Sequence, residues 1–142
     1  MYNTFKMKIM RKGDLFMVRK LSLTEADSNK IPKIKKINVD CINAYELVVR
    51  DLLKMKSIYN SGDEAIYAGK LSGGELVIIF ISSGTKYGPV VYIWPANTDP
   101  DAIDDIITIC SGGRFDEEIP SFIDDCNAKE YSFWEFVQEQ LY

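Results

Sequence analysis

The spacing of apolar residues in residues 43–58 is helical. Apolar side chains recur there at intervals of three and four, while most charged residues take the positions between them. This spacing is typical of an amphipathic helix with one buried face. Asn, Ser and Gly in residues 59–63 are residues that end helices. We therefore expect a helix whose buried face is formed by Tyr45, Val48, Val49, Leu52 and Met55.

Three runs rich in β-forming residues follow, at residues 65–71, 75–82 and 89–94. Short glycine-bearing segments, residues 72–74 and 83–88, connect them, which favours antiparallel hairpins over helical crossovers. The middle run is apolar at every position from 76 to 81, so both of its faces should be covered. We predict an antiparallel meander with this run at its centre.

Helical patterns return after the strands. Asp99 can cap a helix that has Pro100 at its first position and an apolar face formed by residues 102, 103, 106, 107 and 110. Residues 111–113 should end it, and residues 120–126 predict another short helix. Ser132 and Glu135 match the Ser-x-x-Glu capping box, which predicts a C-terminal helix through Leu141.

The first forty residues are less regular. Residues 15–21 predict a strand, residues 22–32 have the composition of a surface loop, and residues 33–39 predict an exposed strand rich in lysine. Taken together, the patterns predict a single α+β domain over residues 1–142. Its antiparallel meander sheet should have about four to five strands, packed by two or three helices.

Length and composition fit that single domain. The chain has 142 residues, of which 46% are hydrophobic and 27% are charged. The longest apolar run has the length of a strand, so we expect no membrane span, and the N-terminus lacks the apolar core of a secretory signal. We expect a cytoplasmic protein. Its three cysteines are widely spaced and form no zinc-binding pattern.

The chain contains no histidine, which excludes several kinds of catalysis. Ser-His-Asp and Cys-His hydrolysis and imidazole proton transfer all need this residue. Ser83 and Lys86 match Ser-x-x-Lys but lie between two strands, and Asn97-x-Asp99-x-Asp101 lacks the glycine and the glutamate of an EF-hand loop. We therefore expect no enzyme activity, no catalytic residues, no metal and no cofactor.

Charge is segregated along the chain. Residues 1–60 carry thirteen Lys/Arg and six Asp/Glu, and residues 61–142 carry four and fifteen. The two parts therefore have net charges of +7 and −11, which together give −4. Lysine at a sheet edge protects it against pairing with other chains, which explains much of the basic cluster without nucleic acid. We do not expect a nucleic-acid partner, although Lys30, Lys33, Lys35 and Lys36 are the residues that would bind one.

Acidic residues gather beside aromatic ones in the second part. Aromatic side chains anchor protein interfaces, and carboxylates at the rim speed encounter with a basic partner. This combination suits an inhibitor of a basic, nucleic-acid-handling protein such as a toxin or a defence nuclease. A solvated acidic surface over core aromatics explains the same pattern, and the sequence leaves both open. The candidate partner-binding residues are Tyr92, Trp94, Asp99, Asp101, Asp104, Asp105, Asp116, Glu117, Glu118, Asp124 and Asp125.

The competing hypothesis is a protein that binds or sequesters a small, nucleotide-like ligand. Phe80, Asn97 and Arg114 would then line a pocket together with Tyr92 and Trp94. Whether an exposed edge strand pairs two copies into a homodimer is also left open by the sequence.

Half of the chain resembles a known family. The segments Glu75-Leu76-Val77-Ile78-Ile79 to Gly88-Pro89-Val90-Val91-Tyr92-Ile93-Trp94, and Ser132-Phe133-Trp134-Glu135-Phe136, are similar to the SUKH superfamily of bacterial toxin-immunity proteins. The N-terminal helices of that family, with their Leu-Pro signature, are absent from the pattern, and residues 97–130 are longer than the family needs. The resemblance implies an α+β domain that blocks a toxin by binding it, without catalysis.

Overall fold

The computed structural model of the chain describes residues 17, 45–82 and 89–140. The expected N-terminal strand, apart from Met17, the loop after it and the lysine-rich strand lie outside the described residues, as do Ser83, Lys86, Leu141 and the side chain of Asp116. The elements are η2 (Leu47–Leu52), β1 (Lys56–Asn60), β2 (Glu64–Lys70), β3 (Leu76–Ser82), β4 (Val90–Trp94), α3 (Pro100–Ser111), α4 (Phe115–Asp125), β5 (Lys129–Ser132) and α5 (Phe133–Glu139).

The five strands form one sheet in the order β1-β2-β3-β4-β5, and every neighbouring pair is antiparallel. The predicted α+β class and antiparallel meander are therefore confirmed. Helices α3 and α4 lie in the connection between β4 and β5. Met17 makes a parallel bridge with Lys70, at the end of β2.

Strand β3 is the centre of the sheet, as its continuous apolar sequence predicts. Its alternate residues Val77, Ile79 and Ile81 belong to one buried cluster, and Leu76, Ile78 and Phe80 belong to another. Successive side chains of a strand point to opposite faces, so both faces of β3 are covered. Each fully buried aliphatic side chain stabilises the fold by about 1.5–3 kcal/mol, which makes β3 the main apolar contribution of the sheet.

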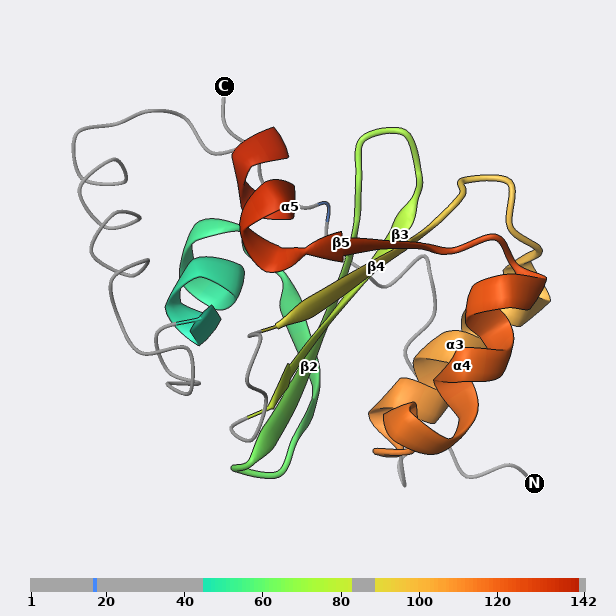
Figure 1. Ribbon diagram of the computed structural model, residues 1–142, viewed down its shortest axis with the longest axis horizontal. Helices are drawn as coiled ribbons and strands as arrows, with labels where there is room; N and C mark the ends of the chain where they lie inside the picture. The colour runs from blue at the N-terminus through green and yellow to red at the C-terminus, as the bar shows by residue number, and fades with distance from the viewer. Residues whose placement is uncertain (1–16, 18–44, 83–88, 141–142) are drawn as a thin grey trace, which may run out of the picture.

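Helices cover both faces of the sheet (Figure 1). Helices η2 and α5 pack on the face that carries Val77 and Ile79, and α3 and α4 pack on the opposite face. The result is a three-layer arrangement with the sheet in the middle. No helix in the described ranges is long and apolar enough to cross a membrane.

The helix predicted over residues 43–58 is wrong in its second half. Helical structure ends with η2 at Leu52, and β1 begins at Lys56. The last turns are wider than α-helical, since the amide of Leu53 donates to the carbonyl oxygen of Val48 at 2.9 Å. Lys54 then adopts a left-handed φ of 59°, which turns the chain into the strand. The expected buried residues Tyr45, Val48, Val49, Leu52 and Met55 are all buried.

Helix α3 begins and ends as expected. The Asp99 carboxylate accepts a hydrogen bond from the amide of Asp101 at 2.8 Å, and Pro100 takes the first helical position. At the other end Gly113 has a φ of 76°, and a Cβ on it would lie 2.6 Å from the ring of Tyr59. Only glycine allows the turn into α4 to pack this closely on β1.

Helix α4 is longer than the predicted segment 120–126, because it begins at Phe115 and contains Pro120 in its interior. Buried Phe115 and Ile119 hold the turn that precedes the proline. The Ser132 cap is confirmed: its hydroxyl accepts from the amide of Glu135 at 3.3 Å, and α5 then runs to Glu139.

Candidate functional site

Helices α3 and α4 form an antiparallel pair that we name the acidic hairpin, residues 99–125 (Figure 1). It contains nine Asp/Glu and a single basic residue, Arg114. Its net charge of −8 is concentrated on 27 residues. The exposed carboxylates with described side chains are Asp99, Asp101, Asp105, Glu117, Asp124 and Asp125, whereas Asp104 and Glu118 are half-buried.

The basic residue of the acidic hairpin, Arg114, forms an ion pair within the hairpin. Arg114 Nη1 lies 3.1 Å from Glu118 Oε1, one helical turn further along α4. An exposed pair of this kind contributes about 0.3–0.5 kcal/mol to the helix. Arg114, which the ligand hypothesis placed in a pocket, is thus engaged with Glu118. The sequence of residues 99–125 contains no other Lys or Arg.

The two ends of the acidic hairpin meet near Cys126. Partial burial raises the pKa of the Cys126 thiol, and the nearby carboxylates of Asp125 and Asp99 raise it further. Asp99 begins α3 and Asp125 ends α4, so the negative charge of both helices converges at this end of the layer.

Trp94 lies in the core and not on the surface, which argues against the predicted role of its side chain as an anchor for a partner. It is 0% exposed, and its indole N–H donates to the carbonyl oxygen of Phe122 at 3.4 Å. Successive side chains of β4 point to opposite faces of the sheet. The side chain of Trp94 points to the face that α3 and α4 cover. The tryptophan therefore belongs to the core beneath the acidic hairpin.

The neighbouring aromatics also pack inward. Tyr92 is half-buried, with its ring centroid 5.7 Å from that of Phe115, and Phe80 is buried against the same Phe115 ring. Asn97 is exposed in the turn between β4 and α3. The contacts described for Phe80 and Tyr92 are thus core contacts between the sheet and α4.

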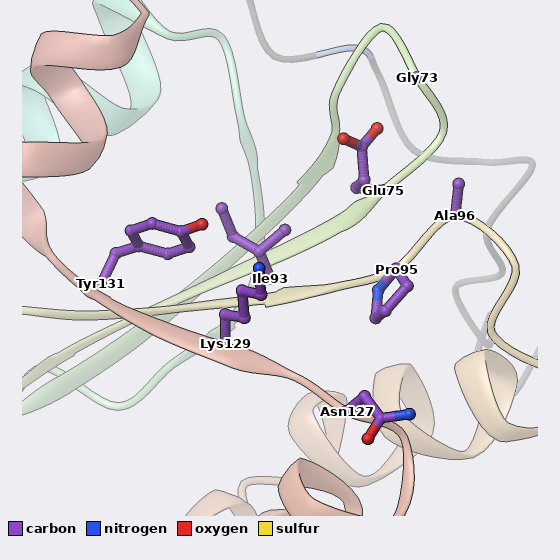
Figure 2. A pocket seen from close by; sticks show the side chains of 8 residues that line it. All are labelled: Gly73, Glu75, Ile93, Pro95, Ala96, Asn127, Lys129 and Tyr131. Carbon is purple, nitrogen blue, oxygen red and sulfur yellow. The ribbon is translucent and has the colours of Figure 1, made fainter.

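A pocket of about 430 Å³ lies elsewhere, where β3 begins, β4 ends and β5 begins (Figure 2). The sequence did not predict it, because its walls come from three segments that only the β4–β5 pairing brings together. In the sequence, the only feature that marks this region is the Gly73-Gly74 turn. The lining residues are Gly73, Glu75, Ile93, Pro95, Ala96, Asn127, Lys129 and Tyr131.

A buried polar pair joins η2 to β2. The hydroxyl of Tyr67 donates a hydrogen bond to Glu46 Oε2, and Glu46 is only 8% exposed. Burial raises the pKa of Tyr67 well above its usual range, and the bond to Glu46 raises it further. This pair holds the helix on the sheet and stands far from the acidic hairpin, on the opposite face.

Fold and surface define a class: an α+β domain whose antiparallel sheet lies between two helical layers, one of them strongly acidic. Within the described part of the chain, no group of three or more Cys, Asp or Glu residues is arranged to hold a metal ion. Comparisons with family models, curated proteins and solved structures found no match to the chain. The resemblance to the SUKH superfamily stays a prediction.

Proposed function

We propose that this chain is a non-enzymatic protein that binds a basic, nucleic-acid-handling protein through the acidic hairpin and inhibits it. The observation that carries the proposal is the charge of residues 99–125, where nine carboxylates are set against one arginine. Most of these carboxylates are exposed, and Arg114 is already paired with Glu118.

The concentration of negative charge on α3 and α4 destabilises the fold. Like charges on two packed helices repel one another, and a partner that supplies Lys or Arg relieves the repulsion. Capping accounts for Asp99, whose carboxylate accepts from the amide of Asp101, and the helix dipole favours Asp101 in the first turn. Neither effect accounts for Asp105, Asp124 or Asp125, since these residues lie in the middle of α3 or at the end of α4.

The interface should depend on charge more than on apolar anchors. Trp94 and Phe115 are buried, and among the described residues the exposed large hydrophobic side chain is Met17, outside the acidic hairpin. An interface without buried aromatic residues at its centre gains little binding energy from hot spots. Complementary charge still raises its association rate. We therefore expect fast association that weakens steeply with salt.

A nucleic-acid-handling partner fits this chemistry. Proteins that hold phosphate present clustered Lys and Arg, and a dense set of carboxylates can occupy the same groove. Inhibition would follow from occlusion, without a reaction on the partner. Toxin immunity, which the SUKH resemblance implies, and counter-defence by a mobile element are the two settings in which such an inhibitor acts.

Two charge variants of the full chain test the proposal. The hairpin variant carries Asp105→Lys, Glu117→Lys and Asp124→Lys. The control variant carries Asp63→Lys, Glu130→Lys and Glu139→Lys, which are exposed positions outside the acidic hairpin. Each variant has a net charge of +2 instead of −4, because each substitution adds two charges.

The experiment is quantitative capture from cells of the native host, followed by an activity assay of the captured protein on nucleic acid. We expect the wild type and the control variant to capture and inhibit the same basic protein, and the hairpin variant to lose both. Capture by the hairpin variant at the wild-type level would reject the acidic hairpin as the binding surface. Capture without inhibition would reject the inhibitory role.

A further inference from the structure

The pocket between β3, β4 and β5 contains a carboxylate with unfilled bonding capacity. Glu75 Oε1 is shielded from solvent and accepts no hydrogen bond from any described residue. A carboxylate that has lost part of its hydration without gaining a donor is destabilised, and a donor that reaches the group restores the loss. Folding has therefore already removed the water from this one oxygen, so a ligand cation that reaches it does not have to displace that water.

Gly73 allows the carboxylate to lie there. A Cβ on Gly73 would stand 2.4 Å from Glu75 Oε1, closer than any real contact. The turn itself is held by backbone bonds, since the amide of Leu71 donates to the carbonyl oxygen of Glu75 and the amide of Gly74 donates to that of Leu71, both at 2.9 Å. The carboxylate thus rests on a fixed turn, beside the pocket (Figure 2).

Lys129 brings the opposite charge to the same pocket. It is directly paired with Ile93 across the β4–β5 ladder, and Ile93 is paired with Val77 across the β3–β4 ladder. Glu75 precedes Val77 by two residues, so it lies beyond the intervening strand β4 from Lys129 and two residues further along the sheet. No ion pair joins Lys129 to a described carboxylate, Glu75 included.

The surface between the two charges is apolar. The side chain of Ile93 lies at the centre of the pocket, with Pro95 on one side and the ring of Tyr131 on the other (Figure 2). Ile93 and Tyr131 pack on the η2–α5 cluster, so the pocket opens on the sheet face opposite the acidic hairpin. Its volume of about 430 Å³ lies within the range of about 300–1,000 Å³ of small-molecule sites.

We propose that this pocket binds a small zwitterion in which an ammonium or guanidinium group and a carboxylate are joined by a short apolar chain. The cation binds Glu75, the carboxylate binds Lys129, and the chain lies on Ile93 between them. A ligand with only one of the charges would leave the other protein charge without its partner. The site is independent of the acidic hairpin and of the partner that the hairpin binds.

The probe is 6-aminohexanoate, titrated into the full chain by calorimetry or followed by NMR. Its single-charge analogues are hexylamine, which lacks the carboxylate, and hexanoate, which lacks the cation. We expect saturable binding of the zwitterion and at least about ten-fold weaker binding of both analogues, because each loses one charge-assisted contact. Absence of saturable binding, or equal binding of either analogue, overturns the proposal.

Variants then assign the two charges. Glu75→Gln and Lys129→Met should each weaken binding of 6-aminohexanoate about ten-fold or more. Gly73→Ala should weaken it as well, because the new Cβ displaces the Glu75 carboxylate, whereas Gly112→Ala is the matched control, with its Cβ 3.5 Å from the nearest atom. Circular dichroism checks that each variant is folded. Unchanged affinity in Glu75→Gln or in Lys129→Met overturns the assignment.

Discussion

The rings of Phe80 and Phe115 lie parallel, with centroids 4.5 Å apart and planes inclined by 3°. Phe80 belongs to the central strand β3 and Phe115 begins α4, so this contact joins the acidic hairpin to the middle of the sheet. The position of the hairpin carboxylates therefore depends on an aromatic contact in the core beneath them.

Phe115→Ala should lower the free energy of unfolding by about 3–5 kcal/mol, because it removes a buried ring and leaves a cavity against Phe80. Urea denaturation followed by circular dichroism measures the change. Phe122→Ala is the matched control, since Phe122 lies on the same helix and is only half-buried. An equal loss in the two variants would contradict the role given to the stacked pair.

Trp94→Phe separates a core role from an anchoring role. The substitution removes the indole N–H that donates to Phe122 and part of a fully buried side chain, so stability should fall by about 1–3 kcal/mol. The association rate with a captured partner should stay within about two-fold of wild type, because the side chain does not reach the surface. A stable variant with slow association would show that Trp94 contacts the partner.

Tyr67→Phe should cost about 1–3 kcal/mol of stability, because it leaves the buried Glu46 carboxylate without the hydroxyl that donates to it. Tyr131→Phe is the control: that hydroxyl makes no hydrogen bond with a described residue, so its loss should cost less than about 0.5 kcal/mol. Thermal or urea denaturation compares the two, and equal costs would reject the proposed role of the pair.

Stability should decline at alkaline pH. Burial raises the pKa of the Cys110 thiol from its ordinary 9.0 to about 12, so the folded state holds that proton more tightly than the unfolded state. The protonated Cys110 thiol makes its full contribution to the free energy of unfolding below pH 9. This contribution is lost as the pH rises from about 9 toward 12, by at most about 1.4 kcal/mol per pH unit. The raised pKa of Tyr67 acts in the same direction above pH 10.

Cys110→Ala should make this alkaline decline shallower, even though the variant is less stable at neutral pH. The measurement is the free energy of unfolding by urea at a series of pH values, for wild type and variant in parallel. Parallel pH profiles for the two proteins would contradict a thiol whose pKa is raised by burial.

Local patterns in the sequence were sufficient for the sheet centre and for helix α3. The uninterrupted apolar run of β3 requires cover on both faces, and Asp99 with Pro100 specifies a helix start through backbone geometry alone. The end of the helix and the start of β1 within residues 53–58 could not be predicted from local patterns. Met55 continues the helical spacing, yet its position is buried whether the chain is helical or turns at Lys54 to begin β1.

The candidate sites were predicted unevenly for a physical reason. The acidic hairpin is local in sequence, so its charge could be counted directly, whereas the burial of Trp94 depends on α4 packing over β4. The pocket could not be predicted, because Glu75 and Lys129 come together only through the pairing of β5 with β4. Strand β5 has four residues, three of them exposed, and offers no clear strand pattern.

The association rate with the captured partner, measured against ionic strength, tests the central claim most directly. Wild type and the control variant (Asp63→Lys, Glu130→Lys, Glu139→Lys) should associate fast at low salt and slow steeply as salt is added, because the hairpin carboxylates steer the encounter. The hairpin variant (Asp105→Lys, Glu117→Lys, Asp124→Lys) should associate at least about ten-fold more slowly, with a flat salt dependence. Equal rates and equal slopes for the two variants would contradict binding through the acidic hairpin.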